Sequence, residues 1–210
     1  MKPSLHCQTV VAVFVVVATL LVFSNLAMAQ VEKPSEANLQ FTGLFPKSAT
    51  GNGVTDDPTR SGGISAAYTF MLNNWMGLEG AYGWSRDTQN YSGDFGAAGV
   101  QANIHEITGA FVLKPAFHVP KVRPYLVAGP AALRFSPTTS ATAAMAGAMS
   151  QTKAAFVYGG GADFAMTNHL GLRVDYRGFV TKPPDFTVSS LTVGSTTHLA
   201  QPSIGVFFRF

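Results

Sequence analysis

Several charged residues fall on stretches where every second residue is polar. If these polar faces turn inward, their side chains form a network inside the protein, and buried charges must be paired. Asp163 and Arg173 lie equally far from Asn168 in a predicted turn, so we expect them to be cross-strand neighbours that stabilise a strand pair. The predicted chemistry is a plug of salt bridges, and the alternative is a gate or a narrow solute path. The predicted network comprises Glu79, Glu106, Arg134, Asp163, Arg173, Asp175 and Arg177.

Histidines are the other candidates for chemistry, because they serve both in catalysis and as metal ligands. His105 and Glu106 are adjacent in a predicted strand and therefore point to opposite faces. His198 falls among apolar positions, where an interfacial role is expected. A hydrolase of the lipid A deacylase type needs a nucleophile, a base and an orienting group on one face, and no such arrangement is recognisable. His118 and His169 lie in short links without a ligand-like spacing. We expect no catalysis, no cofactor and no metal site.

The elements that must position these residues are stretches of period-two alternation. Successive side chains of a strand point to opposite faces, so this pattern separates two environments. Most stretches approach the ~9–11 residues that a tilted strand needs to cross a bilayer. Gly159–Gly161 lies within one of them and lacks the helix and Lys of a phosphate loop, which favours barrel curvature or close packing. The stretches are residues 38–45, 64–70, 76–84, 105–113, 125–135, 156–166, 170–180 and 204–210.

The connections alternate between long and short. Long ones at 46–61, 86–101, 136–152 and 181–196 are rich in small and polar residues, and short links lie between them. In an outer-membrane barrel, long loops face outside and short turns face the periplasm. Eight antiparallel strands joined in this way close on themselves and leave no edge exposed to lipid. Residues 138–150, uncharged and rich in Ala, Thr and Met, fit a flexible external loop, a short helix or an apolar patch.

The N-terminal residues are typical of a secretory signal peptide. Lys2 precedes an apolar run from Val10 to Phe23, and Ala27-Met28-Ala29 forms a small-residue cleavage site. We expect residues 1–29 to be the signal peptide, cleaved after Ala29. Residues 30–36 then form a polar lead-in, and 37–210 form the barrel domain.

Composition agrees with a membrane barrel. Charged residues are only 12% of the chain, against a typical ~25%. The segment after the signal has no apolar run of the ~18 residues expected of a membrane helix. It also lacks a basic run, so we expect no nucleic-acid binding. Predicted strand ends carry aromatic residues, which prefer the membrane–water boundary.

Several motifs resemble the barrel domain of OmpA-like outer-membrane proteins. They are Arg123–Gly129, Gly159–Phe164 with Leu170–Arg177, and the terminal Phe210 after an alternating last strand. The resemblance implies an eight-stranded up-and-down barrel integral to the outer membrane of a Gram-negative-type envelope. It also implies contact with outer-membrane lipids and recognition of Phe210 by the barrel assembly machinery. OmpA continues into a peptidoglycan-binding domain, which this chain lacks, so cell-wall anchoring is not expected.

The resulting expectation is an all-β, monomeric, non-enzymatic barrel with a structural or surface-interaction role. A narrow channel or a lipid-binding barrel is the first alternative. A lipid-modifying outer-membrane enzyme is the second. The sequence does not identify an extracellular ligand.

Overall fold

A computed structural model describes residues 35–94, 96–115, 121–144 and 147–210. The predicted signal peptide with its cleavage site at Ala29, nearly all of the polar lead-in, and His118 lie outside these residues. The described elements are β1 (Glu36–Pro46), β2 (Ala49–Gly51), β3 (Val54–Asp56), β4 (Ser61–Met71), β5 (Met76–Gly93), β6 (Gly96–Leu113), β7 (Val122–Pro137), α2 (Thr139–Ala144), β8 (Gln151–Ala165), β9 (Leu170–Thr181), the 3-10 helix η1 (Ser189–Leu191) and β10 (Thr197–Arg209).

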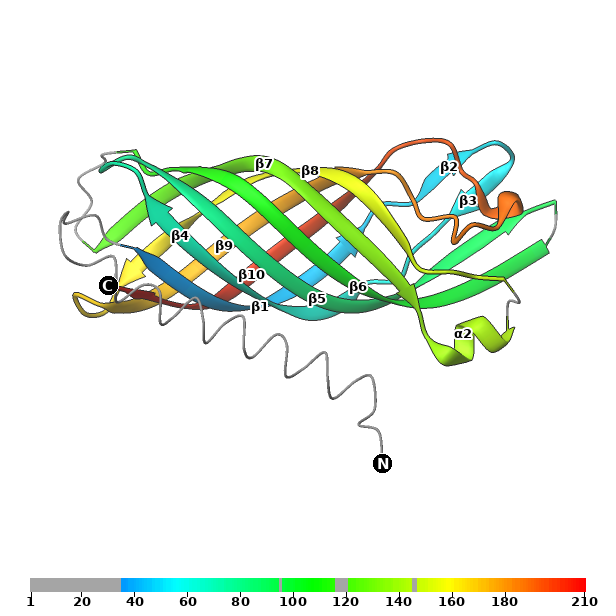
Figure 1. Ribbon diagram of the computed structural model, residues 1–210, viewed down its shortest axis with the longest axis horizontal. Coiled ribbons are helices and arrows are strands. Elements are labelled where there is room, and N and C mark those ends of the chain that lie inside the picture. The colour runs from blue at the N-terminus through cyan, green and yellow to red at the C-terminus, as the bar shows by residue number, and fades with distance from the viewer. Residues whose placement is uncertain (1–34, 95, 116–120, 145–146) are drawn as a thin grey trace, which may run out of the picture. The chain divides into compact units, whose positions relative to one another are not determined.

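Eight long strands of the described chain form a closed antiparallel barrel. Each pairs with its neighbours in the chain order β1, β4, β5, β6, β7, β8, β9, β10, and β1 pairs with β10 to close the ring. The short hairpin β2–β3 adds to β5. Figure 1 shows β2, β3 and α2 at one end of the barrel and the C-terminus at the other. The predicted eight-stranded barrel is confirmed.

The two faces of the strands differ as the alternation predicts. Outward positions are large, apolar and exposed, with Phe41 74% exposed, whereas inward positions are buried. An apolar exterior around a closed sheet suits a bilayer, because lipid cannot hydrogen-bond free backbone groups. None of the helices in the described parts of the chain is long and apolar enough to span a membrane. Outward apolar residues include Leu39, Phe41, Ile64, Phe70, Leu78, Ile107, Phe111, Leu126, Phe156, Leu172, Val174, Ile204 and Val206.

The interior has two levels. Charged side chains fill the end where β1 begins and β10 ends, which is also the end of the short turns. Toward the long loops most buried side chains are apolar and exclude water. Asp87 and Gln89, joined by a hydrogen bond of 2.7 Å, are buried among them. This apolar level includes Leu44, Ile104, Leu133, Phe135, Val157, Phe179 and Leu199.

Three predicted irregular segments contain regular structure. The predicted loop 86–101 is a hairpin, because β5 continues to Gly93 and β6 starts at Gly96. Here the strand pattern persists with polar residues outward and Tyr91 and Val100 buried, so a search for outward apolar residues misses it. The loop 46–61 holds β2 and β3. Residues 138–150 contain α2, which agrees with the short-helix alternative. The lead-in ends earlier than predicted, since Glu36 already belongs to β1.

Candidate functional site

Arg173 occupies the centre of the charged interior. It points inward from β9 and is 1% exposed. Its register partner on β8 is Asp163, and the Arg173 Nε and Nη2 atoms donate to the two Asp163 carboxylate oxygens at 2.6 and 2.8 Å. Nη2 also donates to Glu36 Oε2 at 3.0 Å. The guanidinium carbon lies 4.7 Å from the ring centroid of Tyr125 and 5.6 Å from that of Phe207. The arginine is therefore held by charge and by aromatic faces.

Glu36 contacts three cations, which come from different parts of the barrel. Besides Arg173, it accepts hydrogen bonds from Lys114 and from Arg209, whose Nη2 lies 2.6 Å from Glu36 Oε1. Lys114 Nζ also donates to Asp163 at 3.3 Å. Three members of this network, Glu36, Lys114 and Arg209, were not predicted from the sequence. Glu36 falls in the predicted lead-in and Lys114 in a predicted short link. Extending the alternation by two residues before Asn38 and by one after Leu113 would have found them, since Glu36 shares its face with Asn38 and Lys114 shares its face with Val112.

Arg177, two inward positions beyond Arg173 on β9, forms a second centre further in. Its Nη2 donates to Asp175 Oδ2 at 3.0 Å, and its Nη1 lies 2.8 Å from Glu79 Oε1. Glu79 Oε2 is 3.9 Å from Arg173 Nη1, so this carboxylate connects the two arginines. The Tyr125 hydroxyl donates to Asp175 Oδ2 at 2.6 Å. The two centres thus form one continuous network.

Glu106 is buried but contacts an amide instead of a cation. Gln201 Nε2, from the opposite side of the ring, donates to both Glu106 carboxylate oxygens at 2.9 and 2.8 Å. Among the described residues, no cation lies within ion-pair distance of Glu106. The described network contains five carboxylates and four cations, namely Glu36, Glu79, Glu106, Asp163 and Asp175 with Lys114, Arg173, Arg177 and Arg209.

The placement of Arg134 in the interior network is wrong. Its side chain is exposed and points outward, while its neighbours Leu133 and Phe135 are buried. The assumption that polar faces turn inward fails on β7, because this part of the strand lines the apolar level of the interior. The alternation separates two faces, but it does not state which face is inside at a given height.

The histidines that could serve a catalytic site lie on the outside of the barrel. His105 Nδ1 is 2.7 Å from the Tyr82 hydroxyl, and His198 Nε2 is 2.9 Å from the Tyr158 hydroxyl. Glu106 points to the interior, away from His105. Within the described residues, no group of three or more His, Cys, Asp or Glu side chains could hold a metal ion.

The segment between β9 and β10 covers the outer end of the interior. Phe186 is fully buried and meets the Tyr91 ring edge-on, with centroids 6.4 Å apart. The Tyr91 hydroxyl donates to the carbonyl of Pro184 at 2.5 Å. Asp185 accepts hydrogen bonds from Gln151 at 2.7 Å and from Thr187 N–H at 3.1 Å. These contacts fix the segment as a cap over the apolar level.

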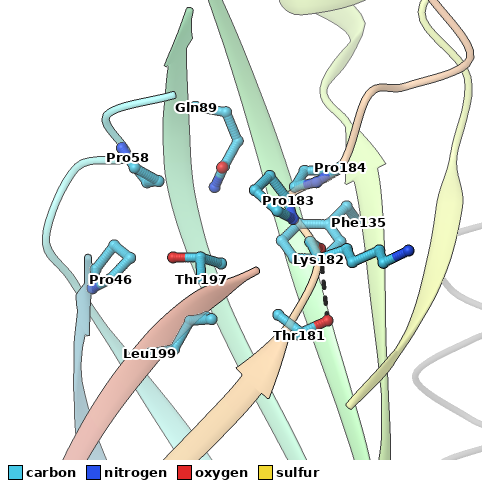
Figure 2. A pocket seen from close by; sticks show the side chains of 10 residues that line it. All are labelled: Pro46, Pro58, Gln89, Phe135, Thr181, Lys182, Pro183, Pro184, Thr197 and Leu199. Carbon is cyan, nitrogen blue, oxygen red and sulfur yellow. Dashed lines mark hydrogen bonds between the residues drawn. The ribbon is translucent and has the colours of Figure 1, made fainter. Parts of the chain in front are cut away.

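A small pocket lies beside this cap (Figure 2). The Thr181 hydroxyl donates to the Lys182 carbonyl at 3.5 Å, and four proline rings lie around the remaining space. The pocket offers no converging catalytic groups. Its lining residues are Pro46, Pro58, Gln89, Phe135, Thr181, Lys182, Pro183, Pro184, Thr197 and Leu199.

A buried carboxyl group lies in the external hairpin. Asp56, at the end of β3, is 1% exposed. Burial raises its pKa to about 8, and the negative charges of Asp87 and Asp57 add to the shift. Because the charged form is disfavoured, this carboxyl should be largely protonated at neutral pH.

The sequence and the fold of this chain are similar to those of known outer-membrane proteins. The family profile described as "Outer membrane protein beta-barrel domain" matches residues 15–196. Ail of Yersinia pestis, solved with the heparin analogue sucrose octasulfate, is 16% identical, covers 86% of this chain and 100% of its own, and gives a TM-score of 0.53. Neisserial surface protein A is 16% identical over 84% of this chain and 97% of its own, with a TM-score of 0.58.

AlkL, solved by solid-state NMR in DMPC bilayers, is 11% identical over 88% of this chain and 93% of its own, with a TM-score of 0.53. At sequence identities this low, the similarity to the solved structures shows a common fold and no more. No curated protein sequence matches it.

Proposed function

We propose a structural and surface-interaction role without solute conduction for this chain, which belongs to the outer membrane protein β-barrel domain family. It is an integral protein of the outer membrane. The observation that carries the proposal is the filled interior. An eight-stranded barrel is only wide enough for its side chains. Here paired charges occupy one level, and mostly apolar side chains, with Asp87 and Gln89 among them, occupy the other.

The cost of opening the interior supports the closed state. A path for ions would require Arg173 to leave Asp163 and Glu36, and Phe186 to leave the outer end. Breaking a buried ion pair costs ~3–5 kcal/mol per pair removed, and burying a phenylalanine contributes ~1.5–3 kcal/mol. Both would have to occur together, so the open state is rarely populated.

Conductance in planar lipid bilayers tests this proposal. The folded parent protein should give no discrete conductance steps at 100-mV-scale potentials. As a matched pair, Arg177→Ala removes a side chain of the interior network and Lys121→Gln removes an exposed cation in a turn. Regular conductance steps from the parent protein would contradict the closed barrel and favour the narrow-channel alternative. Steps from Arg177→Ala alone would show that the network keeps the barrel closed.

The proposed surface role rests on outer loops whose conformation is fixed by hydrogen bonds. The β5–β6 hairpin, the β2–β3 hairpin and the capping segment are fixed by hydrogen bonds such as Tyr91 to Pro184 and Asn90 Nδ2 to the Asp57 carbonyl at 3.1 Å. Such loops present a defined surface to the exterior. The structurally similar Ail was solved in complex with a heparin analogue, which supports a role in ligand contact for this chain.

Export and assembly complete the proposal. The signal peptide would be removed after Ala29, and the barrel assembly machinery would read the last strand ending at Phe210. The folded product would be a monomer in the outer membrane. N-terminal sequencing of the membrane-bound protein should begin at Gln30, and an intact Met1 would contradict cleavage. A catalytic role is not part of the proposal, and unchanged lipid composition after overexpression is the expected result.

A further inference from the structure

The outer boundary of the apolar exterior carries nitrogen-bearing side chains on three adjacent strands. Going toward the loops, the next outward residue after Trp84 on β5 is Arg86, after Ile107 on β6 is His105, and after Ala132 on β7 is Arg134. We call Arg86, His105 and Arg134 the basic rim. Arg86 and Arg134 are exposed and His105 is half-buried.

The strand register brings the rim together. His105 lies opposite Trp84 on one side and opposite Arg134 on the other. The Arg86 guanidinium carbon is 5.9 Å from the Trp84 ring centroid, and its Nε donates to Asn103 at 2.7 Å. Arg86 Nε is thereby used to fix its side chain, and His105 Nδ1 is held by the Tyr82 hydroxyl at 2.7 Å, while the Arg86 Nη atoms make no hydrogen bond with the described residues.

The rim differs from the interior in its charge balance. Every interior arginine has a carboxylate within 3.0 Å, as in the pairs Arg173–Asp163, Arg177–Glu79 and Arg209–Glu36. Among the described residues, neither Arg86 nor Arg134 forms an ion pair. The two guanidinium groups, held on the strands on either side of β6, repel one another unless an anion lies between them.

The height of the rim matches a lipid headgroup. A strand tilted by ~45° advances ~2.3 Å along the membrane normal per residue, so ~11 residues cross the ~25 Å apolar band of an outer-membrane barrel. The segment from Trp75, in the short turn before β5, to Arg86 has about this length. Trp84 and Tyr82 lie just below the rim, where aromatic residues mark the membrane–water boundary.

We propose that the basic rim binds a phosphate group of an anionic lipid in the outer leaflet. Arginine presents several N–H donors in a planar fork that matches phosphate oxygens. The Tyr82 hydroxyl engages His105 Nδ1, which leaves Nε2 for the same ligand. Acyl chains of that lipid would lie on the outward apolar residues of β5, β6 and β7 directly below.

Fluorescence of Trp84 provides a local readout. The chain has only two tryptophans, so Trp75→Phe leaves Trp84 as the single reporter. This background protein, folded in neutral maltoside micelles, would be titrated with lipid A that carries two phosphates. Dephosphorylated lipid A with the same acyl chains and inorganic phosphate are the two comparison probes. Heat-modifiable gel mobility would establish that each variant is folded.

The expected effect follows from the charge of the rim. A cation at an anionic membrane surface contributes ~1 kcal/mol, so Arg86→Gln with Arg134→Gln should weaken lipid A binding about 25-fold. The control variant Lys121→Gln with Arg123→Gln removes two exposed cations near the periplasmic turn and should stay within about twofold of the parent. Arg86→Lys with Arg134→Lys keeps the charge without the fork and should fall between them.

Three results would overturn the proposal. The first is equal binding of lipid A and its dephosphorylated form by the parent, a comparison that needs no variant of the rim. The second is a response to inorganic phosphate as strong as that to lipid A, which would indicate a free anion site. The third is parent-like affinity in the folded glutamine variant.

Discussion

The Asp163–Arg173 pair is the sharpest test of the interior network. Asp163→Ala removes the acceptor of two Arg173 hydrogen bonds at 2.6 and 2.8 Å and of one from Lys114 at 3.3 Å. Loss of one partner from a buried pair costs ~3–5 kcal/mol. Glu36 still contacts both cations, so we expect the lower end, about 3 kcal/mol.

A double-mutant cycle isolates the pair from other effects of the substitution. In Asp163→Ala with Arg173→Met, the poorly compensated arginine is absent. The loss should therefore be about 2 kcal/mol smaller than the sum of the two single losses, within the range for contacting residues. Asp94→Ala, at the exposed tip of the β5–β6 hairpin, is the matched control and should leave the free energy of unfolding unchanged.

The assay is urea unfolding from lipid vesicles, followed by tryptophan fluorescence and heat-modifiable gel mobility. Folding and unfolding curves must coincide before a free energy is taken from them. A single variant within ~0.5 kcal/mol of the parent would refute the reasoning, because surface changes commonly have that size. Strict additivity in the cycle would also refute it, since two residues that contact each other should couple.

Three further predictions concern the outer hairpin, the strand packing and assembly. The pKa of Asp56 is raised to about 8 in the folded protein, so the folded hairpin keeps a proton that the unfolded chain releases at about pH 4. The stability of the β2–β3 hairpin should therefore fall as the pH rises from about 4 to about 8. Hydrogen exchange at residues 49–56, corrected for intrinsic rates, should show this fall, and Asp56→Asn should reduce it to the part due to Asp87, whose pKa burial raises to about 6. Gly161→Ala would place a methyl group 2.9 Å from the Asp175 Cα atom, so it should lower the urea midpoint of unfolding. At Gly80 nothing lies within 4 Å of the added methyl group, so Gly80→Ala should leave the midpoint unchanged. Deleting Phe210 should lower the yield of heat-modifiable barrel in membranes, and an unchanged yield would show that assembly does not read it.

Local rules account for much of the fold. The outward apolar positions, the short turns and the closure of eight strands follow from period-two alternation and from the need to satisfy backbone groups in lipid. Asp163 and Arg173 could be paired from the sequence, because a short turn fixes the register of the two strands that it joins.

Other partners lie too far apart in the chain for a local rule. Glu36 and Lys114 are 78 residues apart, and Glu36 and Arg173 are 137 apart. Only the closure of β1 on β10 brings these side chains into one interior. Phe186 likewise becomes part of the core through the folding of an external segment over the barrel mouth.

The sequence by itself determined that two environments alternate along each strand, and therefore determined the barrel. It did not determine which environment a polar residue meets at a given height. Arg134 and Arg177 occur in similar alternating patterns, yet one lies on the exterior and the other in the interior network. Tertiary structure decided this, because the interior changes from charged to apolar along the barrel axis. That change depends on side chains contributed by all eight strands.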